Sequence, residues 1–101
     1  MSKTLKLVLK RKWWDMIASG EKKEEYRELT EYWESRLVDY PKWTHMGFFK
    51  EFDAVTFYLG YSKDRPSMTF KVKDIRIGLG KSEWGAEPGK EYFVIKLGER
   101  I

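Results

Sequence analysis

Hydrophobic and polar residues alternate along residues 4–9, which place three leucines at every second position. This is the pattern of a half-buried β-strand. After this strand the apolar residues follow helical spacing, and Gly20 stands where a helix of about nine residues would end. Thr30 is a good N-terminal cap for a second helix, whose apolar stripe includes Trp33 and Leu37. The first third of the chain therefore predicts one strand and two short helices.

The second half of the chain has the two-residue period of β-strands. Apolar residues alternate along residues 55–59 and 68–72, with a turn between the two segments. The alternation then shifts by one position into residues 75–79, so we expect a β-bulge near residues 73–74. Residues 92–97 are apolar on both faces, as in a central strand. Together these segments predict an α+β fold with about five strands and two short helices, which we expect to form a small β-barrel.

Two segments have no clear period, and we expect both to be loops. The first, residues 39–52, is rich in aromatic residues, and the second, residues 78–89, is polar and rich in glycine. Loops of this length are uncommon in compact domains and often carry function. If the aromatic side chains of the first loop are exposed, they would form an apolar patch for a protein partner, around Trp43, Phe48 and Phe49. A protein-interaction adaptor is therefore one alternative function.

Composition narrows the class of protein. At 101 residues, residues 1–101 are expected to form a single domain, and the 42% of hydrophobic residues excludes disorder as the main state. The 20 Lys and Arg residues exceed the 16 Asp and Glu residues, which gives a net charge of +4. This mild basic excess is compatible with a polyanionic partner.

The absence of cysteine excludes disulfides and thiol chemistry, and a single histidine excludes a zinc site built from Cys and His within one chain. We expect no cofactor and no bound metal. The sequence has no apolar run of the length of a membrane span and no signal-peptide core. We therefore expect a cytoplasmic protein, with no membrane contact, that is a monomer.

The most informative segment is the charged run that follows the first predicted helix. It contains the spacing G-x-K-x-x-E-x-R, formed by Gly20, Lys22, Glu25 and Arg27. In an extended chain Glu25 and Arg27 point to the same face, so two cations and a carboxylate surround one spot that suits a phosphate. A run of charged residues exposed to solvent on an edge strand could have the same sequence. The spacing alone therefore does not distinguish a binding motif from an exposed strand. We expect Lys22 and Arg27 to be exposed and to stabilise the fold by no more than about 0.5 kcal/mol.

This segment, preceded by Leu-Lys-Leu-Val-Leu-Lys and a short helix with tryptophan, resembles the signature of ASCH domains, which belong to the PUA-like β-barrel superfamily. Residues 84–87 and 92–97 resemble the last loop and strand of small stand-alone ASCH proteins, many of them from phages and gut bacteria. The resemblance implies a PUA-like barrel that binds RNA or a nucleotide in a cleft between the first helix, the motif strand and the late loops. The residues it places at this cleft are Lys10, Gly20, Lys22, Glu25 and Arg27.

The resemblance also supplies an enzymatic alternative in the same cleft, a small hydrolase of ribonuclease or amidohydrolase type. One bacterial branch of the family hydrolyses acylated cytidine with a lysine, a threonine and a glutamate. Lys22 matches the lysine, but Glu25 stands at the threonine position, and a carboxylate cannot replace a hydroxyl nucleophile. The late glutamate would be Glu83 or Glu87. As an enzyme, the protein would use Lys22 as base or electrostatic stabiliser and Glu25 as general base, with or without a divalent ion.

Trp84 lies in the polar late loop, where a core position is less natural than elsewhere. Two roles are open for its ring: packing over the end of the barrel, or stacking on a base of the ligand. Five other aromatic residues lie in regular apolar patterns and are predicted to belong to the core: Trp13, Phe57, Phe70, Tyr92 and Phe93.

Overall fold

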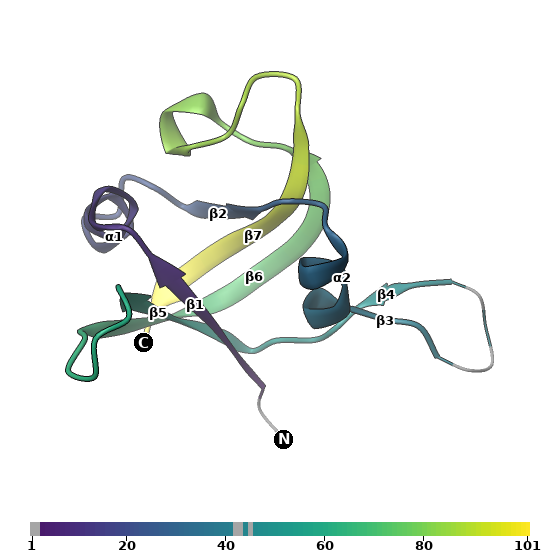
Figure 1. The fold of residues 1–101 in the computed structure, drawn as a ribbon, viewed down its shortest axis with the longest axis horizontal. Helices are drawn as coiled ribbons and strands as arrows, with labels where there is room; N and C mark the ends of the chain where they lie inside the picture. The colour runs from purple at the N-terminus through teal and green to yellow at the C-terminus, as the bar shows by residue number, and fades with distance from the viewer. Residues whose placement is uncertain (1–2, 42–43, 45) are drawn as a thin grey trace.

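A five-stranded sheet curls into a half-barrel in the computed structural model of the protein, which describes residues 3–41, 44 and 46–101 (Figure 1). The strand order is β1-β5-β6-β7-β2, so β1 and β2 are the edge strands of this sheet. Strands β1 and β5 pair in parallel, and the other neighbours pair antiparallel. The strands are β1 (Thr4–Leu9), β2 (Glu24–Arg27), β5 (Ala54–Leu59), β6 (Ser67–Leu79) and β7 (Glu91–Arg100). The predicted α+β fold is confirmed.

Two short helices follow the first two strands. Helix α1 (Arg11–Ala18) buries Ile17, and helix α2 (Glu31–Leu37) buries Leu37. As predicted, Thr30 caps α2, because its hydroxyl accepts a hydrogen bond from the Trp33 amide. Among the described residues, no helix has the length and apolar character needed to cross a membrane.

The aromatic segment between α2 and β5 is more regular than the predicted loop. Strands β3 (Val38–Asp39) and β4 (Phe48–Phe49) pair as a small antiparallel ladder beside α2 (Figure 1). Phe48 is exposed, whereas Phe49 packs against the core. Trp43, which was expected in an apolar patch with these two residues, lies outside the described residues.

The expected β-bulge lies in β6, the longest strand of the sheet. The register between β6 and β7 shifts between Phe70 and Val72 and again between Val72 and Asp74, which confirms the change of phase seen in the sequence. Strand β6 continues to Leu79, so the predicted loop from residue 78 begins two residues too early. Most of the remaining loop is irregular, but it contains one short 3-10 helix, η1 (Ser82–Trp84).

The buried apolar residues form one main core and one smaller cluster. Of the five aromatic residues predicted there, Phe57, Phe70 and Phe93 are buried in this main core, and Tyr92 is buried in a smaller cluster with Ala86 and Val94. Trp13 is only half-buried, so its assignment to the core was incomplete. The buried residues of the main core are Leu5, Leu7, Leu9, Ile17, Leu37, Val55, Phe57, Met68, Phe70, Phe93, Ile95 and Leu97.

Candidate functional site

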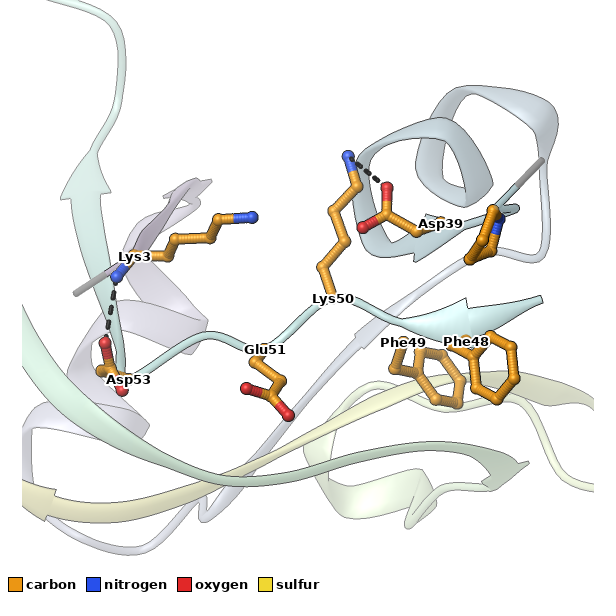
Figure 2. Close-up of a pocket in the computed structure, with 8 residues that line it drawn as sticks. Lys3, Asp39, Phe48, Phe49, Lys50, Glu51 and Asp53 are labelled. Carbon is orange, nitrogen blue, oxygen red and sulfur yellow. Dashed lines mark hydrogen bonds and ion pairs between the residues drawn. The ribbon is translucent and has the colours of Figure 1, made fainter. Parts of the chain in front are cut away.

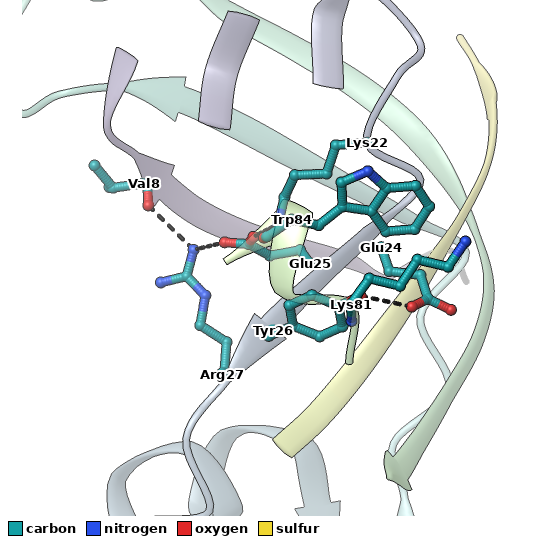
Figure 3. Close-up of polar contacts among 8 residues, drawn as sticks. All are labelled: Val8, Lys22, Glu24, Glu25, Tyr26, Arg27, Lys81 and Trp84. Carbon is teal, nitrogen blue, oxygen red and sulfur yellow. Dashed lines mark hydrogen bonds and ion pairs between the residues drawn. The ribbon is translucent and has the colours of Figure 1, made fainter. Parts of the chain in front are cut away.

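The second half of the charged motif, Glu25 and Arg27, lies on edge strand β2, which pairs with β7, and Lys22 precedes this strand. Because successive side chains alternate in a strand, Glu25 and Arg27 point to one side of β2, toward β1 (Figure 3). Tyr26 contributes to the smaller core cluster with Tyr92, and its hydroxyl donates a hydrogen bond of 2.7 Å to Glu24 Oε1. The side chains of β2 are therefore divided between a polar site, which Glu25 and Arg27 face, and the apolar cluster that contains Tyr26.

A hollow of about 250 Å³ lies where the end of β1, helix α1, strand β2 and η1 meet. We call it the motif pocket. It collects five of the six predicted site residues: Lys10, Lys22, Glu25, Arg27 and Trp84. The other lining residues are Val8, Leu9, Trp13, Tyr26 and Gly85.

Lys22 is buried, with 2% of its surface exposed, so the expectation of an exposed cation is wrong. Its ammonium lies 3.0 Å from Glu25 Oε1 and donates a hydrogen bond of 2.5 Å to the main-chain carbonyl of Trp84. The rings of Trp13 and Tyr26 lie within about 5 Å of the same ammonium, at 5.0 and 4.9 Å from their centroids. Burial lowers the pKa of Lys22 below its ordinary value, and the Glu25 carboxylate opposes this change. The carboxylate, the carbonyl and the two rings thus hold the ammonium of Lys22 in place.

Arg27 connects the two edge strands of the sheet. Its Nη2 donates a hydrogen bond of 2.5 Å to Glu25 Oε2 on β2 and one of 3.1 Å to the carbonyl of Val8 on β1 (Figure 3). The guanidinium also lies 4.9 Å from the ring centroid of Trp33. Its Nε is buried and has no hydrogen-bond partner among the described residues. A buried donor of this kind is costly unless a ligand or water accepts its hydrogen bond.

Glu25 is the carboxylate of the site, and both of its oxygens are occupied by cations, Oε1 by Lys22 and Oε2 by Arg27. These three groups carry a net charge of +1, and Lys10 on the pocket wall adds a fourth charge. Nowhere in the described part of the chain do three His, Asp or Glu side chains gather as metal ligands would. The net positive charge of the pocket favours an anion or a group of hydrogen-bond acceptors as its ligand.

Gly20 does not line the motif pocket, contrary to its predicted role in ligand binding. It adopts a φ of +86°, and a Cβ added there would meet no atom within 4 Å. This left-handed conformation ends α1 and returns the chain, so that the Lys22 amide donates a hydrogen bond of 2.9 Å to the Met16 carbonyl. Gly20 thus contributes to the geometry of the site through the position of Lys22.

The late loop brings a tryptophan to the pocket but neither of its two candidate glutamates. Glu83 and Glu87 are exposed, and neither lines the motif pocket. The half-buried ring of Trp84 does line it, and Lys81 Nζ lies 4.4 Å from the centroid of that ring. The predicted acid from this loop is therefore not in place beside Lys22.

Trp13 is a site residue that the sequence pattern did not reveal. Its ring lies against Gly85, where an added Cβ would come within 3.0 Å of the indole and where φ is +105°. The helical spacing of Trp13 with Ile17 suggested a core position for both, but only Ile17 is fully covered. The two tryptophans of the pocket thus come from α1 and η1, elements far apart in the sequence.

A second hollow, of about 480 Å³, lies beside the β3–β4 ladder and contains none of the predicted site residues (Figure 2). Its charges are two lysines and three carboxylates, which gives a net charge of −1. Lys50 faces Asp39 at 3.9 Å, and the Lys3 amide donates a hydrogen bond of 3.0 Å to Asp53. This hollow does not suit a polyanionic ligand, so the motif pocket remains the candidate site.

Comparisons of the chain with models of protein families, with curated proteins and with solved structures find no match. The geometry of the motif pocket is therefore what carries the functional argument.

Proposed function

We propose that the protein is an ASCH-type, PUA-like domain of the cytoplasm that binds RNA or a nucleotide in the motif pocket. The observation that carries this proposal is the convergence of three cations, Lys10, Lys22 and Arg27, on one pocket in which Glu25 is the one carboxylate among the described lining residues. A phosphate or base oxygen in the pocket would accept hydrogen bonds from the Lys10 ammonium and the Arg27 guanidinium, and charge-assisted hydrogen bonds of this kind are stronger than neutral ones. The positive charge of the pocket favours an anionic ligand.

Each wall of the pocket would have its own role in binding. Lys10 directly follows β1 and is exposed, so its ammonium can reach a phosphate without leaving another charge unpaired. Trp84 and Trp13 supply ring surface on which a base can stack. Lys22 and Glu25 are occupied with each other and with Arg27, so they position the guanidinium rather than contact the ligand first.

The volume of the motif pocket limits how much of a ligand it can enclose. At about 250 Å³ it is smaller than the roughly 300–1,000 Å³ of pockets that enclose drug-sized ligands. One nucleotide unit, and not a folded oligonucleotide, is the size of ligand that the pocket accommodates. A longer RNA would have to continue over the surface of the protein.

A second candidate function, a small hydrolase acting on RNA or a modified nucleoside, is favoured by the contact between Lys22 and Glu25. A lysine whose pKa is lowered by burial, with a carboxylate 3.0 Å away, is an arrangement that acid–base catalysis uses. Here Lys22 would serve as base or electrostatic stabiliser. Glu25 would serve as general base only if a ligand displaced one of its two cations.

The binding function is tested by fluorescence anisotropy with labelled single-stranded RNA at several salt concentrations. We expect affinity to fall with salt, with a slope that reflects about two to four phosphate contacts. Lys10→Ala should weaken binding several-fold. Lys63→Ala, which removes an exposed lysine from outside the pocket, should leave binding unchanged.

The outcome that would contradict the binding function is the same affinity for wild type and Lys10→Ala, or binding that does not respond to salt. Incubation with a panel of RNAs and modified nucleosides, with and without magnesium, followed by mass spectrometry, tests the hydrolase. A product of changed mass that Glu25→Gln abolishes would favour the enzyme over the binding domain.

A further inference from the structure

A second basic feature lies on the sheet beside the bulge of β6. Residues of β6, β7 and the approach to β2 line an open hollow of about 710 Å³ there. We call it the lysine groove, after the four lysines on its walls. Its lining residues are Lys23, Lys71, Val72, Lys73, Lys96, Leu97, Gly98 and Glu99.

The charges of the lysine groove are strongly unbalanced. Its four ammonium groups face one lining carboxylate, Glu99, which gives a net charge of +3. Glu99 lies 2.9 Å from Lys71, and no other lysine of the groove forms an ion pair within the described ranges. All four lysines are exposed.

Two acidic residues on the neighbouring strands, Glu24 and Asp74, lie beside the groove. In the register of the sheet, Lys96 lies opposite Glu24 on one side and Asp74 on the other. Glu24 is paired instead with Arg76, at 3.6 Å, and Asp74 forms no ion pair with any described residue. These two carboxylates lower the positive charge near Lys96, while the residues that line the groove keep a net charge of +3, which favours an anionic ligand.

The backbone around the bulge gives the groove its shape. The register shifts on either side of Val72 interrupt the regular ladder where Lys71 and Lys73 project. Across from them Gly98 lies close to β6, and a Cβ added there would come within 3.3 Å of the Lys71 Cβ. Because Gly98 has no side chain, the groove stays open between the lysines, and a phosphate can approach the backbone there.

We propose that the lysine groove binds the phosphates of an RNA strand of which one nucleotide occupies the motif pocket. This inference rests on the proposed function. Lys22 lines the pocket and its neighbour Lys23 lines the groove, so the chain segment that leads into β2 borders both sites. Since β2 is an edge strand, an RNA strand can pass around it from one site to the other.

The experiment compares a labelled dinucleotide with a labelled single-stranded RNA of twelve nucleotides, each titrated at several salt concentrations. Lys73→Gln/Lys96→Gln removes two unpaired cations from the groove. Lys6→Gln/Lys63→Gln is the matched control, because it removes the same charge from exposed positions outside the groove. We expect the longer RNA to bind wild type more tightly than the dinucleotide does. The groove variant should lose this advantage. The slope of its log affinity against log salt concentration should become shallower by about 1.4, or about 0.7 for each phosphate contact that is lost.

Four outcomes would overturn the proposal. If the groove variant binds the longer RNA as wild type does, the groove has no role, while the motif pocket keeps its function. An equal loss in the control variant would assign the effect to net charge. If neither RNA binds wild type, the proposed function fails together with the groove. Binding to phosphatidylserine vesicles that the groove variant loses, without binding to RNA, would make a membrane the partner.

Discussion

The ammonium of Lys22 donates a hydrogen bond of 2.5 Å to the main-chain carbonyl of Trp84, 62 residues further along the chain. This contact holds the late loop, which contains Trp84, against the segment that leads into β2. A second bond supports it, because the Lys81 amide donates a hydrogen bond of 2.9 Å to the hydroxyl of Tyr26. The acceptor on Trp84 is its backbone, so the indole ring can be changed without removing the connection.

Lys22→Met is expected to destabilise the protein by about 1.5–3 kcal/mol, the usual scale for losing hydrogen bonds to a charged group. The substitution leaves the Trp84 carbonyl without its donor and leaves Glu25 with Arg27 as its one cation. Denaturation in urea measures the change. Lys23→Met is the control, because the neighbouring lysine is exposed and should change stability by no more than about 0.5 kcal/mol. Equal stability of the two variants would show that the buried lysine contributes nothing to the fold.

Trp84→Ala is expected to weaken binding of a nucleotide or RNA by about 1–3 kcal/mol, which is typical for the loss of one stacked base. Trp84→Phe should retain most of the affinity, because a smaller ring still offers a stacking face. Titration of the three proteins against one ligand makes the comparison. If all three bind equally and only Trp84→Ala melts at a lower temperature, the ring packs against the protein and does not contact the ligand.

Gly80→Ala is expected to cost about 1–3 kcal/mol of stability, as overpacking does. A Cβ at this position would come within 2.6 Å of the Tyr26 ring and 2.7 Å of the Ala86 Cβ, and neither atom can move freely. Gly78→Ala is the matched control, since there the new Cβ would meet the far end of the flexible Arg76 side chain. Thermal melts should therefore show a large change for Gly80→Ala alone. A similar loss in both variants would mean that strand geometry, and not the Tyr26 contact, decides the outcome.

Tyr26→Phe is expected to change how stability depends on alkaline pH. Burial raises the pKa of Tyr26 well above its ordinary value, and the hydrogen bond to Glu24 raises it further. Above about pH 10 the unfolded chain loses this proton while the folded chain keeps it, so stability falls as pH rises, by up to about 1.4 kcal/mol per pH unit. The variant lacks this loss. The difference in unfolding free energy between wild type and Tyr26→Phe should therefore shrink between pH 9 and pH 11, and parallel profiles would contradict the assignment.

Much of the fold follows from rules that act over a few residues. The alternation of residues 4–9 marks the bounds of β1, the Thr30 hydroxyl marks the start of α2, and the change of phase marks the bulge of β6. The ladder of β3 and β4 was not predicted, because strands of two residues have no detectable period and depend on contact with a partner across the loop.

The residues of the candidate site were predicted in part, since Gly20 does not line the pocket and Trp13 was missed, and its internal contacts were not predicted. The motif spacing and the resemblance selected Lys22, Glu25 and Arg27, and the structure places them around one pocket. The burial of Lys22 could not be seen, because its acceptor on Trp84 is distant in sequence and is a carbonyl that every residue type carries.

The motif pocket lies between the two edge strands of the sheet, and this has a consequence for motion. Strands β1 and β2 do not pair with each other, and in the described structure Arg27 joins them through a side chain. The residues of β1 also pair with residues fifty positions later in β5, as Thr4 does with Ala54, so closing this part of the sheet needs a long loop of chain. Amide hydrogens of β1 and β2 should therefore exchange with solvent sooner than those of β6 and β7. A ligand that contacts Lys10 and Arg27 together would slow this exchange in both edge strands at once.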